Sequence, residues 1–308
     1  MIINSTLLSK LFNTSKKEVD NYCANYLKEN LYFKYLNSKE IEFAAIHIIK
    51  KIATDSQIIA SKERKKIWFN GWNQSLKSYS KNKNLENLIP KFYTARKNNI
   101  FRLGGRFIKV KNPMFEVKMV KIFTNWYFKK YFYNVDNIYE FGAGTGHNLL
   151  ELSKIYPEKK LHGSDFVQSS VNLLKLVAKI NDISLNCFKF DMINPNKKKK
   201  ILKNSAVYTS GALEQLSGNI YKFINYILSS NPKIVLHAEP VADFYDKNQL
   251  PDCLANLFQT KRGYTDNLLT HLRNLEKKKK IKIIKLCKSP FGSLMIEGYN
   301  LIVWRPLR

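Results

Sequence analysis

Three glycines at alternate positions follow an acidic residue in the stretch IYEFGAGTGHNLLEL. They are Gly142, Gly144 and Gly146, and Glu140 stands two residues before the first of them. Glycine has no Cβ, so a ligand can lie against the backbone of such a turn and accept hydrogen bonds from its N–H groups. An open parallel sheet binds its ligands where a strand turns into the next helix. The spacing therefore predicts a ligand-binding turn after residue 141.

Two more acidic residues are expected at the ends of the following strands. LHGSDFVQSS ends a predicted strand in Asp165, which lies 165 − 146 = 19 residues after the last glycine, and NCFKFDM ends the next in Asp191. A carboxylate at the first of these ends can accept hydrogen bonds from both hydroxyls of a ribose. Each acid alone could instead cap a helix or a loop turn. Three acids at successive strand ends favour one shared ligand site.

The order of these features resembles the class I S-adenosylmethionine-dependent methyltransferases, whose motif I has the spacing E-x-G-x-G-x-G. A dinucleotide-binding turn, G-x-G-x-x-G, would need glycine where this chain has His147. The stretch SAVYTSGALEQLSG is similar to the S-x-x-L-E-H stretch of small-molecule members, with Gln215 in place of the histidine. The resemblance covers about residues 115–308 and does not place the residues before them.

The resemblance implies S-adenosyl-L-methionine as the cofactor and gives its contacts position by position. Glu140 would orient the methionine amino group, and Asp165 would hold the ribose. Asp191 would meet the adenine amino group, with Met192 packed on the ring. The other residues expected at the cofactor are Gly142, Ala143, Gly144, Gly146, Phe166 and Ser210.

The implied fold is α/β, a doubly wound, mostly parallel seven-stranded sheet with a Rossmann-like arrangement and an antiparallel final hairpin. Short apolar runs alternate with amphipathic ones beyond about residue 135, as in βαβ units. Strands are predicted over 136–141, 160–165, 186–190, 205–209, 233–238, 280–287 and 297–304, and helices over 146–155, 168–180, 218–229 and 262–276. We expect two domains, a mainly helical one over 1–130 and a cofactor-binding catalytic one over 131–308.

The first domain is expected to shape the acceptor pocket as a lid. Helices are predicted over 38–53, with Ser38 as N-cap, over 62–79, and over 115–132. The run NIFRLGGRFIKV predicts a hairpin that turns at Gly104 and Gly105. The aromatic residues proposed for the lid, which could equally form a plain core, are Trp68, Trp72, Phe92, Tyr93 and Trp126. Three arginines near the hairpin could grip a phosphate or carboxylate of the acceptor, or simply be solvated: Arg96, Arg102 and Arg106.

Methyl transfer from a sulfonium is an in-line displacement, so the protein chiefly aligns the acceptor and excludes water. A hydroxyl acceptor also needs a base. Candidates near the ends of the fourth and fifth strands are His237, Glu239 and Glu214. His237 is favoured because imidazole titrates near neutral pH, although a histidine on a buried strand is often only a core residue. Glu239 is an equal rival, because Pro240 forces an extended entry to the loop.

The formal net charge of +28 could indicate a nucleic-acid partner. However, 44 of the 52 basic residues are lysine, whereas base recognition favours arginine. The loop after the fourth strand reads TSGAL and lacks the N/D-P-P-Y/F stretch of nucleic-acid enzymes of this fold. A small-molecule acceptor, such as a sugar or another biosynthetic intermediate, is therefore preferred, with O-methylation favoured over N-methylation. An RNA or protein methyltransferase that docks its partner on the basic amino-terminal part, and a non-enzymatic scaffold, remain alternatives. The four cysteines are scattered, with no metal cluster, signal peptide or membrane-length run, so we expect a cytoplasmic protein. The oligomeric state stays open.

Overall fold

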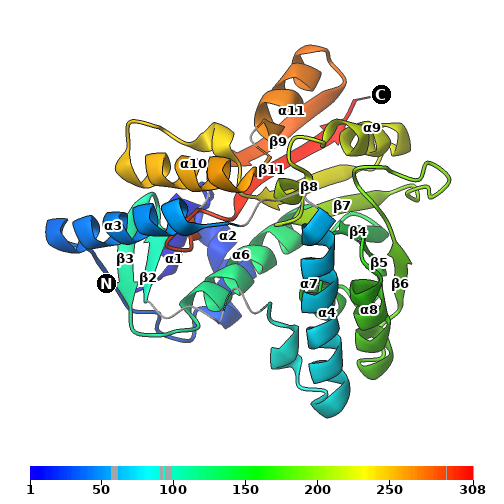
Figure 1. Cartoon of the computed structure of the whole chain (residues 1–308). Coiled ribbons are helices and arrows are strands. Elements are labelled where there is room, and N and C mark those ends of the chain that lie inside the picture. Colours follow the sequence, from blue (N-terminus) through cyan, green and yellow to red (C-terminus); the bar gives the residue numbers. More distant parts are fainter. Residues whose placement is uncertain (57–61, 91–92, 94–98, 266, 289, 308) are drawn as a thin grey trace.

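The centre of the fold is a seven-stranded sheet with the order β6-β5-β4-β7-β8-β11-β9 (Figure 1). The structure is a computed structural model and describes residues 1–56, 62–90, 93, 99–265, 267–288 and 290–307. The strands of this sheet are β4 Asn137–Phe141, β5 Lys160–Asp165, β6 Leu185–Lys189, β7 Ser205–Ser210, β8 Ile234–Glu239, β9 Ile281–Cys287 and β11 Asn300–Pro306. All neighbours pair in parallel except β11, which is antiparallel to β8 and β9. The predicted fold class, a mostly parallel seven-stranded α/β sheet with an antiparallel final hairpin, is confirmed.

The helices of this half are α7 His147–Ile155, α8 Gln168–Ile180, α9 Tyr221–Ser230, α10 Leu250–Arg262 and α11 Leu268–Lys277, with short 3-10 turns η3 Leu213–Leu216 and η4 Ala242–Phe244. The helix predicted over 262–276 is wrong at its start, and α10 was not predicted at all. The chain leaves α10 at Gly263, whose φ of 66° lies in the left-handed region and whose N–H closes the helix on Gln259 and Thr260. Glycine takes this conformation without a steric penalty, so it ends one helix before the next begins.

The amino-terminal part adds helices and a small antiparallel sheet of order β1-β3-β2-β10. Its elements are α1 Ser5–Leu11, α2 Lys16–Cys23, η1 Ala24–Tyr26, β1 Phe33–Tyr35, α3 Ser38–Thr54, α4 Lys62–Asn82, η2 Leu85–Leu88, β2 Ile100–Leu103, β3 Arg106–Val110 and α6 Phe115–Tyr131, and β10 Phe291–Gly292 comes from the far end of the chain. The hairpin turns at Gly104 and Gly105, both with positive φ, as expected. The N-cap of α3 is Asn37 rather than Ser38, because Asn37 and Glu40 exchange hydrogen bonds in a capping box.

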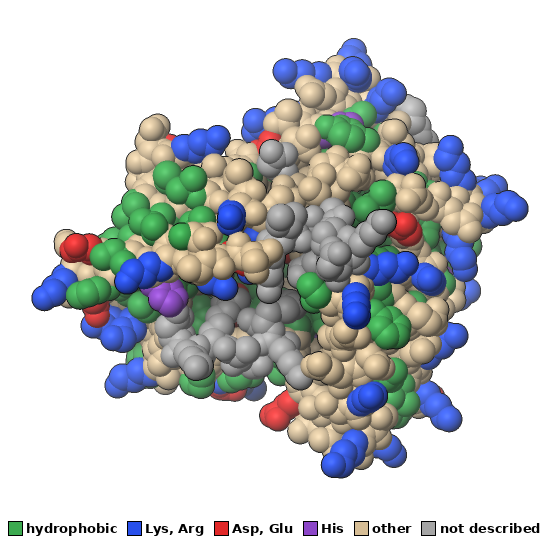
Figure 2. Space-filling view, viewed as in Figure 1, with side chains coloured by type: hydrophobic (Ala, Val, Ile, Leu, Met, Phe, Trp, Pro, Cys, Tyr) green, Lys and Arg blue, Asp and Glu red, His purple; other side chains and the backbone are tan. Residues whose placement is uncertain are grey.

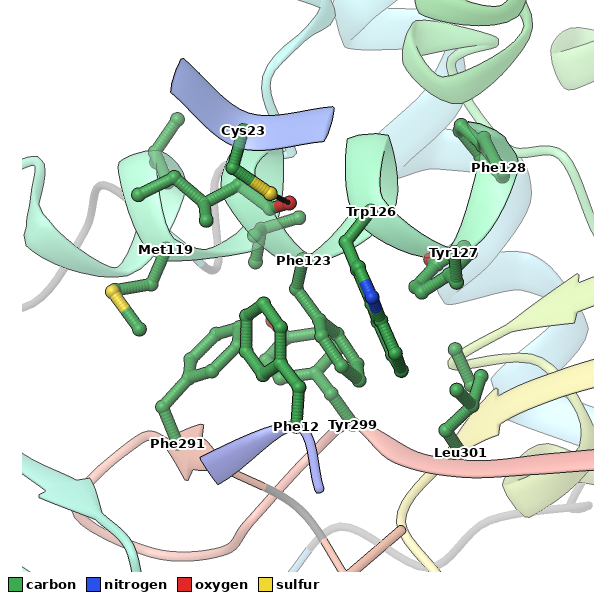
Figure 3. Close-up of a cluster of buried hydrophobic side chains, with 14 of the residues drawn as sticks. Phe12, Cys23, Met119, Phe123, Trp126, Tyr127, Phe128, Phe291, Tyr299 and Leu301 are labelled. Carbon is green, nitrogen blue, oxygen red and sulfur yellow. Dashed lines mark hydrogen bonds between the residues drawn. The ribbon is translucent and has the colours of Figure 1, made fainter. Parts of the chain in front are cut away.

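The largest core joins the two halves of the chain through α6 (Figure 3). Trp126 is fully buried, and its ring centroid lies 5.0 Å from that of Phe12. Phe291 packs edge-on against Phe123 of the same helix. Residues on both sides of position 130 therefore share one hydrophobic core, and β10 completes the sheet of the amino-terminal part.

Lysine and arginine side chains are spread around the visible face (Figure 2). The lysine runs at 197–200 and 277–280 are exposed, in a loop and around the end of α11. No helix among the described residues is long and apolar enough to cross a membrane.

Candidate active site

A cavity of about 670 Å³ opens at the carboxyl ends of β4 and β7. Glu140, Gly142, Ala143 and Gly144 border it from the first strand and its turn, and Ser210 borders it from the end of the second. The opposite walls come from elements distant in the sequence, and their aromatic members are Trp68, Trp72, Tyr93, Phe258, Tyr264 and Tyr299. The structure thus brings five of the predicted cofactor residues to one hollow.

The glycine turn is tightly packed within the protein itself. Gly142 has a φ of 77°, and a Cβ placed on it would lie 2.5 Å from Cβ of Ala212. A Cβ on Gly146, the residue that precedes α7, would lie 2.6 Å from Leu174. Both positions require glycine because of backbone conformation and close packing. Gly146 does not border the cavity, so its role in the structure is to let the chain enter the helix.

Glu140 presents an unsatisfied carboxylate oxygen at this turn. The side chain is 2% exposed, and Oε1 accepts a hydrogen bond of 2.8 Å from Asn148. Oε2 is buried and has no hydrogen-bond partner among the residues that the structure describes. Burial raises the pKa of Glu140 to about 8, because an ionised carboxylate loses its hydration there. A cationic group in the cavity would satisfy Oε2 and favour the ionised form.

Asp165 lies just behind the cavity wall. It is 4% exposed, Oδ2 accepts from the N–H of Gly144 at 3.1 Å, and Oδ1 accepts from Val167 at 3.1 Å. Burial raises its pKa to about 6. The indole of Trp72 covers Gly144, since a Cβ on that glycine would lie 3.0 Å from Cζ2 of the indole. Asp165, the acid expected to hold the ribose, is therefore adjacent to the cavity but does not border it.

The structure does not bring the predicted adenine residues to this cavity. Asp191 is exposed, and its Oδ1 accepts from the N–H of Ile193 in a local turn. Met192 is 9% exposed and packs in the core beside Gly142. Phe166 borders a second hollow of about 450 Å³ with Phe69. Glu140 and Asp165 lie at the ends of β4 and β5 and Asp191 lies two residues after β6, but the three acids do not border one cavity.

His237 does not border the cavity. It is fully buried in β8, with Nδ1 at 2.8 Å from Oγ1 of Thr209 and its ring beside Trp304. Burial lowers its pKa to about 3. Nε2 is buried without a hydrogen-bond partner among the described residues. A general base needs access to the methyl acceptor, and His237 has no access to this cavity.

Glu239 also lies outside the cavity and holds a loop. Its carboxylate accepts from the N–H groups of Ala212 at 2.9 Å and Leu213 at 3.1 Å, which fixes the chain after β7. Burial raises its pKa. Glu214, the third candidate, does border the cavity and accepts at 3.0 Å from the side chain of Gln215. Of the three predicted catalytic residues, only Glu214 reaches the hollow.

Three residues expected to line or grip the acceptor do not border the cavity. Trp126 is a core residue and does not border the cavity. Arg102 is fully buried, pairs with Glu297 at 3.1 Å and donates to the carbonyl of Leu294 at 2.9 Å, so it is not available to grip an acceptor. The guanidinium carbon of Arg106 lies 3.7 Å from the centre of the Tyr35 ring, and Arg106 does not border the cavity. Phe92 and Arg96 lie outside the described residues.

Several residues that border the cavity were not expected from the sequence. His147 begins α7, and Glu116 and Tyr299 come from α6 and the segment before β11. The oxygen of Tyr299 lies 3.5 Å from Oε1 of Glu116. His147 could have been found from its position directly after the glycine turn. The other two had no local signal, because they reach the site only through the packing of α6 and the last strands.

No protein-family model and no curated protein matches the chain. Among solved structures, "PigF with SAH" is 12% identical, with a TM-score of 0.48 over 97% of this chain and 77% of that one. Magnesium protoporphyrin IX methyltransferase (ChlM) from Synechocystis PCC 6803 with bound SAH is 11% identical, with a TM-score of 0.45 over 62% and 83%. An O-methyltransferase family 2 protein from Planctomyces limnophilus in complex with apigenin is 12% identical, with a TM-score of 0.42 over 56% and 51%. Likeness at this level concerns the fold, and the ligands named belong to those proteins.

Proposed function

We propose that this chain is an S-adenosylmethionine-dependent methyltransferase that acts on a small molecule in the cavity at the glycine turn. The observation that carries the proposal is the buried Oε2 of Glu140, which has no hydrogen-bond partner in the described part of the chain and lies beside the backbone of Gly142. An amino acid ammonium group is the complement of such a carboxylate, because it supplies charge and N–H donors together. The residues present therefore suit the methionine end of the cofactor.

The cofactor would supply an activated methyl group on its sulfonium. The protein would align the two reactants and exclude water from them. Glu140 would hold the ammonium group, and the backbone of the glycine turn would leave room beside it. Tyr93 and Tyr299, whose stacked rings lie 6.4 Å apart, would exclude water from the acceptor. Holding the two reactants in line is the main source of rate in such a displacement. We prefer a hydroxyl acceptor of drug-like or smaller size, which a cavity of about 670 Å³ can enclose.

The adenosyl end requires a rearrangement, because Trp72 covers Gly144 in front of Asp165. The two hollows lie on either side of this point: Trp72 and Gly144 border the larger, and Phe69 and Phe166 border the smaller. Asp165 connects them, since its side chain bonds to Gly144 and it directly precedes Phe166. We propose that binding displaces the indole and joins the two hollows into one cleft, with the ribose at Asp165.

Calorimetry with S-adenosylhomocysteine tests this proposal without knowledge of the acceptor. We expect one site per chain with a dissociation constant in the micromolar range, about −8 kcal/mol. At neutral pH the free Glu140 carboxyl is mainly protonated, so a bound ammonium group should release close to one proton. Titrations in two buffers of different ionisation enthalpy measure that release, and Glu140→Gln should abolish it. Failure to bind at about 1 mM ligand would support the non-enzymatic scaffold instead.

A further inference from the structure

A short chain of hydrogen bonds connects the glycine turn to the segment after α4. The hydroxyl of Thr145 lies 2.6 Å from the carbonyl oxygen of Leu88, and the same Oγ1 lies 3.2 Å from Nδ1 of His147. Thr145 is 1% exposed, so neither contact is shared with bulk water. This series of hydrogen bonds ends at His147, a residue that borders the cavity.

The direction of these bonds fixes the tautomer of His147. A carbonyl oxygen only accepts, so the single hydroxyl proton of Thr145 must point to Leu88 at the 2.6 Å contact. Oγ1 can then only accept from His147, which places the ring proton on Nδ1. The other nitrogen, Nε2, carries a bare lone pair in the neutral ring. The described residues offer no hydrogen bond to Nε2.

The surroundings keep the ring neutral. The pKa of His147 is lowered to about 4, mainly by burial and to a smaller extent by the charge of Lys121 on α6. Other titratable residues border the same cavity. The acidic ones are Glu116, Glu140 and Glu214, the basic ones are His47, Lys51 and Arg262, and the phenols are Tyr93, Tyr264 and Tyr299. The Tyr93 ring meets the imidazole edge-on, with centroids 6.4 Å apart. The ring is therefore neutral and oriented near pH 7.

We propose that His147 is the general base of the methyl transfer, with Thr145 as its positioning residue; the inference rests on the proposed function. Nε2 takes the proton of an acceptor hydroxyl as the acceptor oxygen forms its bond to the methyl carbon. The bond between that carbon and the sulfonium sulfur breaks, and its electron pair stays on sulfur. The imidazolium that results has a low pKa and returns its proton to water as the product leaves.

Nitrogen NMR of the protein labelled at histidine tests the geometry directly, because the chain has only five histidines. The signals of His147 are identified by their loss in His147→Gln. We expect a neutral ring with its proton on Nδ1 at neutral pH, and an exchange of tautomers in Thr145→Val, which removes the acceptor. A ring protonated on Nε2 in the wild type overturns the proposal, whether or not the protein binds cofactor.

The kinetic test uses a labelled methyl donor and the small-molecule fraction of a cell extract. His147→Gln should lower the rate of transfer by about 10²- to 10⁴-fold, the usual contribution of a general base, and should remove the acid limb of the pH–rate profile. The Kd for S-adenosylhomocysteine should change by less than about 3-fold, under 1 kcal/mol. The control His271→Gln, on α11, should leave both unchanged. An unaltered rate, or a loss of cofactor affinity equal to the loss of rate, overturns the role as base. Absence of cofactor binding by the wild type instead rejects the proposed function.

Discussion

The N–H of Gly144 donates a hydrogen bond to Oδ2 of Asp165 across 3.1 Å. This contact ties the middle of the glycine turn to the end of the neighbouring strand. A carboxylate oxygen can accept more than one hydrogen bond, so Asp165 can hold the turn and still accept from a ribose. The same residue therefore contributes to both the fold and the proposed binding site.

Replacing Asp165 separates these two contributions. Asp165→Asn keeps one acceptor for the backbone but removes the charge, and we expect it to weaken S-adenosylhomocysteine binding by about 1.5–3 kcal/mol. Asp165→Ala should in addition lower the free energy of unfolding, because the N–H groups of Gly144 and Val167 lose their acceptor. Calorimetry and urea unfolding measure the two effects. Asp191→Asn is the comparison, and its exposed side chain should give a smaller loss of affinity; the reverse order would contradict the structure.

The pH dependence of stability should report the buried Glu140 carboxyl. Its pKa is raised from 4.5 in the unfolded chain to about 8 in the fold. Its contribution to stability is thus fully present below about pH 4.5 and is lost as the pH rises toward 8. Glu140→Gln has no such titration, so its free energy of unfolding should fall less than that of the wild type between about pH 5 and pH 8. Urea unfolding across this range measures the difference, and two parallel profiles would mean that the carboxyl titrates normally.

Removing the indole of Trp72 should favour cofactor binding. Because Trp72 covers Gly144 in front of Asp165, part of the binding free energy is spent on displacing the indole ring. Trp72→Ala is expected to tighten S-adenosylhomocysteine binding by up to about 10-fold, and binding should change the tryptophan fluorescence of the wild type. Ile67→Ala, an exposed residue of the same helix, should leave the affinity unchanged. Weaker binding in Trp72→Ala would show that the indole holds the cofactor rather than blocking it.

The two arginines of the hairpin should differ sharply in their effect on stability. Arg102 is fully buried against Glu297, so Arg102→Ala leaves a carboxylate buried without its cation and should lower the free energy of unfolding by about 3–5 kcal/mol. Arg106 is exposed and only stacks on Tyr35, so Arg106→Ala should cost at most about 1 kcal/mol. Chemical denaturation compares the two. Similar small losses would place Arg102 at the surface, contrary to the structure.

Short-range patterns determined much of the fold. The alternation of apolar runs and amphipathic helices gave the strands of the large sheet to within three residues, because a buried parallel strand must be apolar throughout. Local chemistry also located the hairpin at Gly104 and the glycine turn at Gly142. It failed near Gly263, because the helix expected from residue 262 begins only at Leu268 and α10, which ends at Arg262, was not expected.

The sequence by itself placed Glu140, Asp165 and the glycine turn at the carboxyl edge of the sheet, because parallel strands bring their ends to one side. Only the tertiary structure decided which side chains share the cavity. It buried His237 in β8 and bonded Glu239 to the loop after β7. It also brought Trp72 across Gly144 and set Nδ1 of His147 against Oγ1 of Thr145. These outcomes depend on how α4, α6 and the last strands pack from distant parts of the chain, and no local pattern of residue types encodes that packing.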